Sequence, residues 1–242
     1  MIQAMFRVIV VLAAAVLLAC GHRAPSQILL FTGTGTSSGD VAAIESLLGE
    51  MRLGFDTASS SRLNGMSESD LRQYRLLIVP GGNFMHMGES LNAGTSANIR
   101  DAVRNGLNYF GICAGAILAG DGFNLTGVRF RFFSAVNRGI HKTTVAVTDA
   151  DGFTLDQYWE DGPELSGWGA VVAKYPDGMP AVVQGAVGSG WVLLTGVHPE
   201  APESWRRRMT FRTSVNKDRA YAAALVFAAL ARLPLATFDV VK

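Results

Sequence analysis

The sequence predicts an α/β fold, a three-layer flavodoxin-like sandwich with a mostly parallel sheet and an antiparallel extension in its second half. Three observations predict this class. Up to about residue 120, short apolar runs alternate with segments of helical spacing, which is typical of a parallel sheet covered on both faces. After Gly122 the segments are strand-like and joined by turns, and one long helical segment, 217–233, ends the domain.

The elements are expected in a regular order. Apolar runs predict strands at 27–31, 75–79 and 108–113, with a weaker second strand at 54–58, and the run at 75–79 ends in a Pro-Gly-Gly turn. Helical spacing predicts helices at 41–51, from Ser67, at 96–106 with Ser96 near the start and Gly106 as the stop, and at 114–120. The second half is expected to form antiparallel strands from 128–136, 142–148 and 181–200.

The first residues have the pattern of an export signal. Arg7 precedes the apolar run Val8–Ala19, which is short for a membrane span and typical of a signal-peptide core. The run ends in Leu-Leu-Ala-Cys at Cys20, which resembles a bacterial lipoprotein box, where the cysteine carries the lipid; the alternative is an ordinary secretory signal. We expect a signal peptide over 1–19, a tether over 20–25, a domain over 26–242, and a lipoprotein anchored in a membrane and facing the periplasm.

Charge and glycine patterns limit the partners. The formal net charge is +1, which argues against a nucleic-acid partner. The glycine turn after the first strand, Gly33 to Gly39, is one residue off the dinucleotide fingerprint and has Asp56 where a ribose-binding acid would lie; the alternative is a loop that needs glycine for its backbone angles. We expect no cofactor and no metal, although Met-His-Met at 85–87 is a pattern that soft metals accept.

Cys113 is the candidate nucleophile. It follows a predicted strand directly, at the sheet edge where active sites of parallel sheets lie. Gly111 and Gly115 flank it in the pattern G-x-C-x-G, the spacing of a nucleophile elbow with cysteine in place of serine. The helix that follows would favour the thiolate, and the Ala114 N–H would be one oxyanion donor, with Gly82 as the second. The alternative is an inert buried thiol.

A base for Cys113 is expected at His198. This histidine lies at the carboxyl end of a late strand, and Glu200 follows two residues later and would hold the imidazole. The other histidines are His22, His86 and His141. The basic segment 205–209 is interpreted as a solvated face, or as a contact for an anionic substrate.

The chain order of a cysteine, then His-x-Glu, with a Pro-Gly-Gly loop upstream resembles the class I glutamine amidotransferase superfamily. The closest similarity is to the amino-terminal amidotransferase-like domain of biotin–protein ligases, on "FTGTGTSSGDV", "IVPGGN", "YFGICAGAILAG" and "GVHPE", over residues 27–200. The resemblance implies a Cys113, His198 and Glu200 triad that hydrolyses or transfers a small-molecule or peptide-like amide through a thioester. The alternative is a non-catalytic ligand-binding module of the same fold.

The resemblance also suggests where a substrate would lie. Gly81 and Asn83 flank the predicted oxyanion donor. The stretch 157–168 is interpreted as a pocket wall that contributes Tyr158 and Trp159, or as a surface loop. The sequence departs from the superfamily at Ile117, where a glutamine usually helps to hold the substrate, so glutamine is not the expected substrate. No ligase-type adenylate motif follows, so the chain is not expected to be a biotin ligase.

Overall fold

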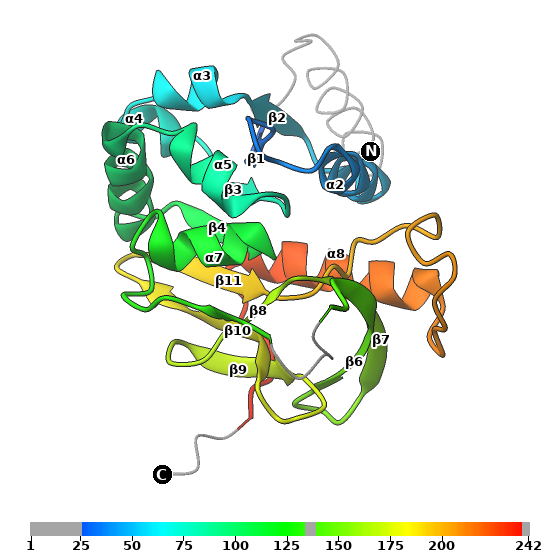
Figure 1. Ribbon diagram of the computed structural model, residues 1–242. Helices are drawn as coiled ribbons and strands as arrows, with labels where there is room; N and C mark the ends of the chain where they lie inside the picture. Colours follow the sequence, from blue (N-terminus) through cyan, green and yellow to red (C-terminus); the bar gives the residue numbers. More distant parts are fainter. Residues whose placement is uncertain (1–25, 134–138, 239–242) are drawn as a thin grey trace, which may run out of the picture.

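The computed structural model describes residues 26–133 and 139–238 (Figure 1). The predicted signal peptide, the tether 20–25 and the predicted lipidation site Cys20 lie outside the described residues. Within the part that is described, no helix is long and apolar enough to cross a membrane.

The described residues build a nine-stranded sheet in the order β2-β1-β3-β4-β11-β10-β9-β6-β7. The strands from β2 to β11 pair in parallel, and those from β11 to β7 pair antiparallel. The predicted α/β class is therefore confirmed. The strands are β1 (Ile28–Phe31), β2 (Phe55–Ala58), β3 (Leu76–Val79), β4 (Asn108–Ile112), β6 (Lys142–Asp149), β7 (Thr154–Glu160), β9 (Ala170–Lys174), β10 (Pro180–Val187) and β11 (Gly190–Thr195), with β5 (Arg131–Phe132) and β8 (Pro163–Glu164) as a separate pair.

Helices cover both faces of the parallel part (Figure 1). One face packs on α2 and α8, and the other on α3 to α7, so that the sheet separates two apolar clusters. In β1, Ile28 and Leu30 belong to the first cluster while Leu29 belongs to the second, which is the alternation that a strand buried on both faces requires. The helices are α2 (Ser38–Glu50), α3 (Ser60–Asn64), α4 (Glu68–Leu71), α5 (Phe84–Glu89), α6 (Ala93–Arg104), α7 (Ala114–Asp121) and α8 (Val215–Ala231).

Several predicted elements differ from the structure. Helix α6 begins at Ala93 rather than near Ser96, because the Asn92 side chain accepts a hydrogen bond from the Thr95 N–H and caps the helix. The stretch 157–168, expected to be a pocket wall or a surface loop, begins inside strand β7. The expected strand 128–136 is reduced to the two residues of β5 among the described residues.

Candidate active site

Cys113 lies on a strained turn between β4 and α7. Its backbone angles are φ 49° and ψ −106°, a region that side chains other than glycine rarely adopt. The flanking glycines are required by close approach: a Cβ on Gly111 would lie 2.7 Å from the Gly115 carbonyl oxygen, and one on Gly115 would lie 2.0 Å from that of Val79. The turn therefore has the geometry of the predicted nucleophile elbow.

Tyr109 supports this turn from inside the core. Its side chain is fully buried, and its hydroxyl donates a hydrogen bond of 2.6 Å to the Gly115 carbonyl. Its ring also fills the space beside Gly111, where a Cβ would lie 2.8 Å from the ring. Tyr109 thus contacts both of the glycines that flank the strained Cys113.

His198 leaves the same edge of the sheet as Cys113. Strands β4 and β11 are parallel neighbours, and Thr195 pairs with Ile112, so both chains end at one level. The His198 N–H donates to the Tyr158 carbonyl at 2.9 Å, which fixes the backbone after β11 against β7. The ring is 4% exposed, and the rings of Tyr158 and Trp205 approach it edge to face.

Two carboxylates share one nitrogen of His198. The Nδ1 atom lies 2.9 Å from Oε1 of Glu200 and 3.0 Å from Oδ1 of Asp40. The Glu200 contact is the one that the sequence predicted. Asp40 was missed, because it lies in the first turn of α2, far from the His-Pro-Glu motif in the sequence.

The loop before α2 carries Asp40 to this position. Ser37 caps the helix by accepting from the Asp40 N–H, and its own N–H donates to the Gly81 carbonyl at 3.0 Å. The Asn83 N–H donates to the Gly35 carbonyl at 2.8 Å, so the glycine turn is joined to the Pro-Gly-Gly loop. The one sequence signal for Asp40 was local: Ser37, a residue type that often caps a helix, lies three residues before it in the glycine turn after β1.

Burial and charge set the protonation of this cluster. Burial alone would lower the pKa of His198, but the charges of Asp40, Cys113 and Glu200 together raise it well above its ordinary value. Burial also opposes ionisation of Asp40, yet His198, the Ser37 hydroxyl and the Gly81 N–H together lower its pKa. For Glu200 burial prevails, and its pKa is raised despite His198. The negative charges around His198 accordingly favour its protonated form.

A cavity of about 690 Å³ opens over the nucleophile. Cys113, His198 and the predicted oxyanion donors Gly82 and Ala114 all line it. Neither of those two backbone N–H groups donates a hydrogen bond to another of the described residues. The Cys113 thiol, 6% exposed, donates to the Glu160 carbonyl at 3.5 Å. The cavity therefore combines a thiol, an imidazole and two free donors.

The residues predicted to line the substrate pocket do not all lie at the same cavity. Asn83 lines the same cavity, and Tyr158 lines a neighbouring cavity of about 1050 Å³. Gly81 packs against the acid and the imidazole, where a Cβ would lie 2.5 Å from Oδ1 of Asp40. Trp159 lines neither cavity: its Nε1–H donates to the Gly162 carbonyl at 3.1 Å, and its ring packs on Phe133 in the core.

Two other motifs, the glycine turn with Asp56 and the Met-His-Met segment, can also be located in the structure. Asp56 hydrogen bonds with Ser26 and Tyr74 and pairs with Arg62, so its carboxylate belongs to a network at the edge of the sheet. In the segment 85–87, Met87 is buried in the core and Met85 is exposed. The possible metal-binding atoms of Asp40, His198 and Glu200 lie within 4.8 Å of one another. A proton on Nδ1 of His198, contacted by both carboxyl groups, also explains why these three side chains lie together.

Comparisons with known proteins support the resemblance. Residues 26–128 match the family described as "Biotin-protein ligase, N terminal". The fold is similar to a solved glutamine amidotransferase at 18% identity and a TM-score of 0.60, covering 86% of this chain and 100% of the other. This chain has the class I glutamine amidotransferase-like fold. A glutamine amidotransferase from Thermotoga maritima gives 12% identity and a TM-score of 0.57 over 85% and 98% of the two chains.

The amidotransferase-like fold is shared with proteins of other named activities. An exo-β-1,4-mannosidase from an Opitutaceae bacterium matches at 15% identity and a TM-score of 0.55, over 84% of this chain and 36% of the other. A comparison with curated proteins gave no match. The family match includes Asp40, Gly82 and Cys113 but ends before His198, so the complete cluster is known here from its geometry.

Proposed function

We propose that this chain is an exported, lipid-anchored enzyme that hydrolyses or transfers an amide through a thioester on Cys113. The observation that carries the proposal is the convergence on one cavity of a strained cysteine, a buried imidazole and two unpaired N–H groups. Strain of this kind persists only where the surrounding structure holds it, and it is concentrated at functional sites. Export and lipidation rest on the sequence pattern around Cys20.

The chemistry follows from the positions of these groups. The neutral imidazole of His198 takes the proton of the Cys113 thiol, and the imidazolium formed in this step holds the thiolate as an ion pair. The sulfur attacks the carbonyl carbon of the amide, and the Gly82 and Ala114 N–H groups bind the resulting oxyanion. When the tetrahedral intermediate collapses, the C–N bond breaks and the leaving amine takes the proton from His198. Water or an acceptor amine, deprotonated by His198, then attacks the thioester and restores the thiol.

Labelling of Cys113 tests the proposal without knowledge of the substrate. An ordinary thiol is almost fully protonated at about pH 6, whereas a thiolate paired with an imidazolium alkylates there. We expect rapid iodoacetamide labelling of Cys113 at about pH 6, slowed markedly in His198→Ala, with Cys113→Ala as the blank. Slow labelling that rises only at alkaline pH and is indifferent to His198→Ala would contradict the enzyme proposal.

One observation favours the second candidate, a non-catalytic binding module. The Cys113 thiol donates to the Glu160 carbonyl and is nearly buried, as an inert thiol would be. A panel of envelope-type amides and peptides, incubated with the wild-type protein and with Cys113→Ala, separates the two candidates. Turnover by the wild type alone supports the enzyme, and binding without turnover by both supports the module.

A further inference from the structure

We propose that Asp40 is the ionised partner of His198 and acts as its positioning residue, while Glu200 is a neutral acid that accepts the second contact. This inference deepens the proposed function and rests on it for the role of Cys113. Two carboxyl groups contact an atom of His198 that has one proton to donate. Both carboxyl groups contact Nδ1, and an imidazolium has one proton on that atom.

In the proposed ion pair the Cys113 thiolate already balances the charge of His198, so two ionised carboxyl groups would add two uncompensated charges to a buried cluster. Asp40, His198 and Glu200 are all buried. An uncompensated charge in such surroundings is strongly unfavourable, so a site of this kind takes up a proton. One of the two carboxyl groups is therefore neutral when His198 is charged.

The surroundings of Asp40 favour its ionised form. It lies in the first turn of α2, a helix of 13 residues, where the positive end of the helix dipole stabilises an anion. The Gly81 N–H and the Ser37 hydroxyl also lower its pKa. Its side chain thus has interactions with the helix end, with the Pro-Gly-Gly loop and with the imidazolium.

The surroundings of Glu200 favour its neutral form. Its Oε2 atom is buried and has no hydrogen-bond partner among the described residues; Oδ1 of Asp40 also has none by hydrogen-bond geometry, but it lies 3.0 Å from Nδ1 of His198. Burial raises its pKa, and the nearby charge of Asp40 raises it further. A neutral carboxyl group still accepts the Nδ1–H through Oε1, so the short contact is retained without a second buried anion.

The other titratable groups that face His198 do not compete for Nδ1. Cys113 comes from the turn after β4, and the negative charge of its thiolate form raises the pKa of His198. Tyr158 packs against the ring from β7, and its hydroxyl donates to Glu160. Asp40 and Glu200 are thus the two groups whose protonation decides the charge at Nδ1.

The test compares Asp40→Asn with Glu200→Gln, with exposed Glu203→Gln as the matched control. The measured quantity is the pH profile of iodoacetamide labelling of Cys113. We expect Asp40→Asn to slow labelling at about pH 6 by roughly tenfold, since a decrease of one unit in the pKa of His198 reduces tenfold the equilibrium constant for transfer of the thiol proton to it. Glu200→Gln should slow labelling less than Asp40→Asn, and Glu203→Gln should match the wild type. An equal or larger effect of Glu200→Gln would overturn the proposal.

Infrared spectroscopy gives a second measurement that does not depend on catalysis or on a variant of Asp40. The wild-type protein at neutral pH should show the carbonyl stretch of a protonated carboxylic acid, and the band should be absent in Glu200→Gln. A band that persists in Glu200→Gln, or that is missing from the wild type, would contradict a neutral Glu200. If labelling is indifferent to His198→Ala while the band behaves as expected, the proposed function fails and the assignment of charge stands.

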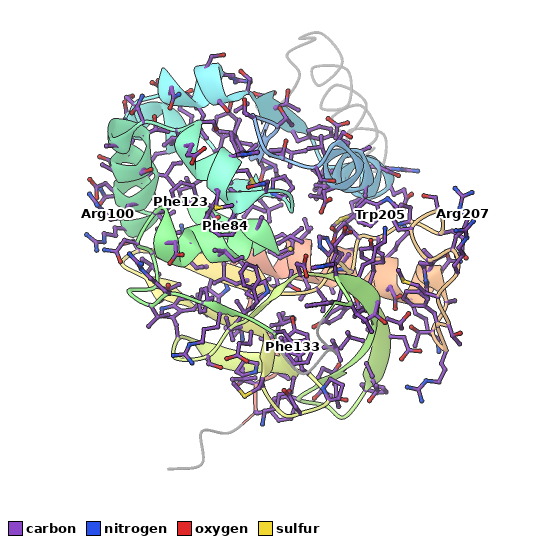
Figure 2. The ribbon with its side chains drawn as sticks, in the orientation of Figure 1. Phe84, Arg100, Phe123, Phe133, Trp205 and Arg207 are labelled. Carbon is purple, nitrogen blue, oxygen red and sulfur yellow. The ribbon has the colours of Figure 1, made fainter. Side chains whose placement is uncertain are left out.

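A different observation concerns the substrate. The wall of the cavity beside Cys113 is apolar: Ile117 lies near the nucleophile, and Phe84, Met85 and Phe132 continue the lining. The Phe84 and Phe132 rings have centroids 6.1 Å apart, and Met85 and Phe132 remain more than half exposed. Phe84 is labelled in Figure 2 on α5, close to α7.

The charged groups that line this cavity include the three carboxyl groups of Asp40, Glu160 and Asp161. Glu160 and Asp161 line it with the two histidines His141 and His198, and none of its lining residues within 26–133 and 139–238 is a lysine or an arginine. The basic residues Lys142, Arg207 and Arg208 line the neighbouring cavity instead. We infer that the substrate carries an uncharged apolar group next to the reacting amide, an inference that uses the proposed function only to define Cys113 as the reacting atom.

Alkylating amides of increasing size test this inference. We compare iodoacetamide, N-hexyl iodoacetamide and iodoacetate, each normalised to its rate with glutathione. The N-hexyl reagent should label Cys113 several-fold faster than iodoacetamide, and iodoacetate should be the slowest. Phe132→Ser should reduce this preference, whereas Phe227→Ser, an equally exposed phenylalanine on α8, should keep it. Rapid labelling at about pH 6 without any preference would overturn the inference and leave the proposed function intact.

Discussion

Replacing Tyr109 by phenylalanine removes one atom, the hydroxyl that holds the Gly115 carbonyl behind the strained cysteine. The hydrogen bond is 2.6 Å long, and Tyr109 is fully buried. The Gly115 carbonyl lies in the first turn of α7, where it also accepts from the N–H four residues further on. It is therefore left with one donor rather than none.

The size of the effect follows from this partial loss. A buried hydrogen bond contributes about 0.5–1.5 kcal/mol net, and a fully orphaned partner adds the cost of its desolvation. Because the Gly115 carbonyl keeps its helical donor, we expect a loss within this net range and without the added desolvation cost, about 1 kcal/mol, or roughly fivefold in the unfolding equilibrium. The ring remains in place, so no cavity of ring size is formed.

Urea unfolding of Tyr109→Phe and Tyr221→Phe measures this directly. The Tyr221 hydroxyl is buried and has no hydrogen-bond partner among the described residues, so its removal should leave stability unchanged or increase it. The labelling rate of Cys113 should also change in Tyr109→Phe, since the turn loses its support. Equal stabilities of the two variants would refute the idea that this hydroxyl holds the elbow.

Three further results are expected. Gly115→Ala should fail to fold normally, because its Cβ would lie 2.0 Å from the Val79 carbonyl oxygen, whereas Gly49→Ala in α2 meets nothing within 4 Å and should stabilise the protein by up to about 1 kcal/mol in thermal melting. The pKa of His198 is raised in the folded protein, so its contribution to stability is fully present below about pH 6.5 and is lost as the pH rises through the raised pKa. The unfolding free energies of the wild type and of His198→Gln should therefore converge with rising pH. A difference that stays constant with pH would contradict this. In the full-length protein expressed in a bacterium, Cys20→Ser should move the chain out of the membrane fraction, and an unmodified mature start beyond Cys20 in mass spectrometry would exclude the lipid.

The elbow could be predicted from sequence because its determinants are local. Gly111, Cys113 and Gly115 lie within one turn, and the spacing alone implies the cramped backbone that the structure shows. The parallel part of the sheet was predictable for the same reason, since β1 and β3 are continuous apolar runs, whereas β2 contains Asp56 and Thr57 and gave a weaker signal. His198 and Glu200 were found because they lie two residues apart at a strand end.

The parts that escaped prediction depend on contacts distant in sequence. Asp40 reaches His198 only because the glycine turn pairs with the Pro-Gly-Gly loop. Strand β7 contains buried polar residues, Asp156 and Gln157, which remove the apolar signal of a strand. The carboxyl group of Asp156 is occupied by the N–H and the guanidinium of Arg212, a partner that no local pattern indicates. The same reasoning explains why Trp159 was placed in the pocket: its burial depends on Phe133, which the sequence did not connect to it.

The packing of Trp205 against His198 offers a fluorescence signal for the site. The indole of Trp205, labelled in Figure 2 on the segment between β11 and α8, has its ring centroid 5.9 Å from that of the imidazole. A protonated imidazole at such a distance quenches indole emission, and a neutral one does so far less. The fluorescence of Trp205 therefore changes whenever the proton on His198 is lost or gained, and the difference between the wild-type protein and Trp205→Phe separates this signal from that of the other tryptophans. A proton transfer to or from His198 is therefore expected to change the emission of the unlabelled protein.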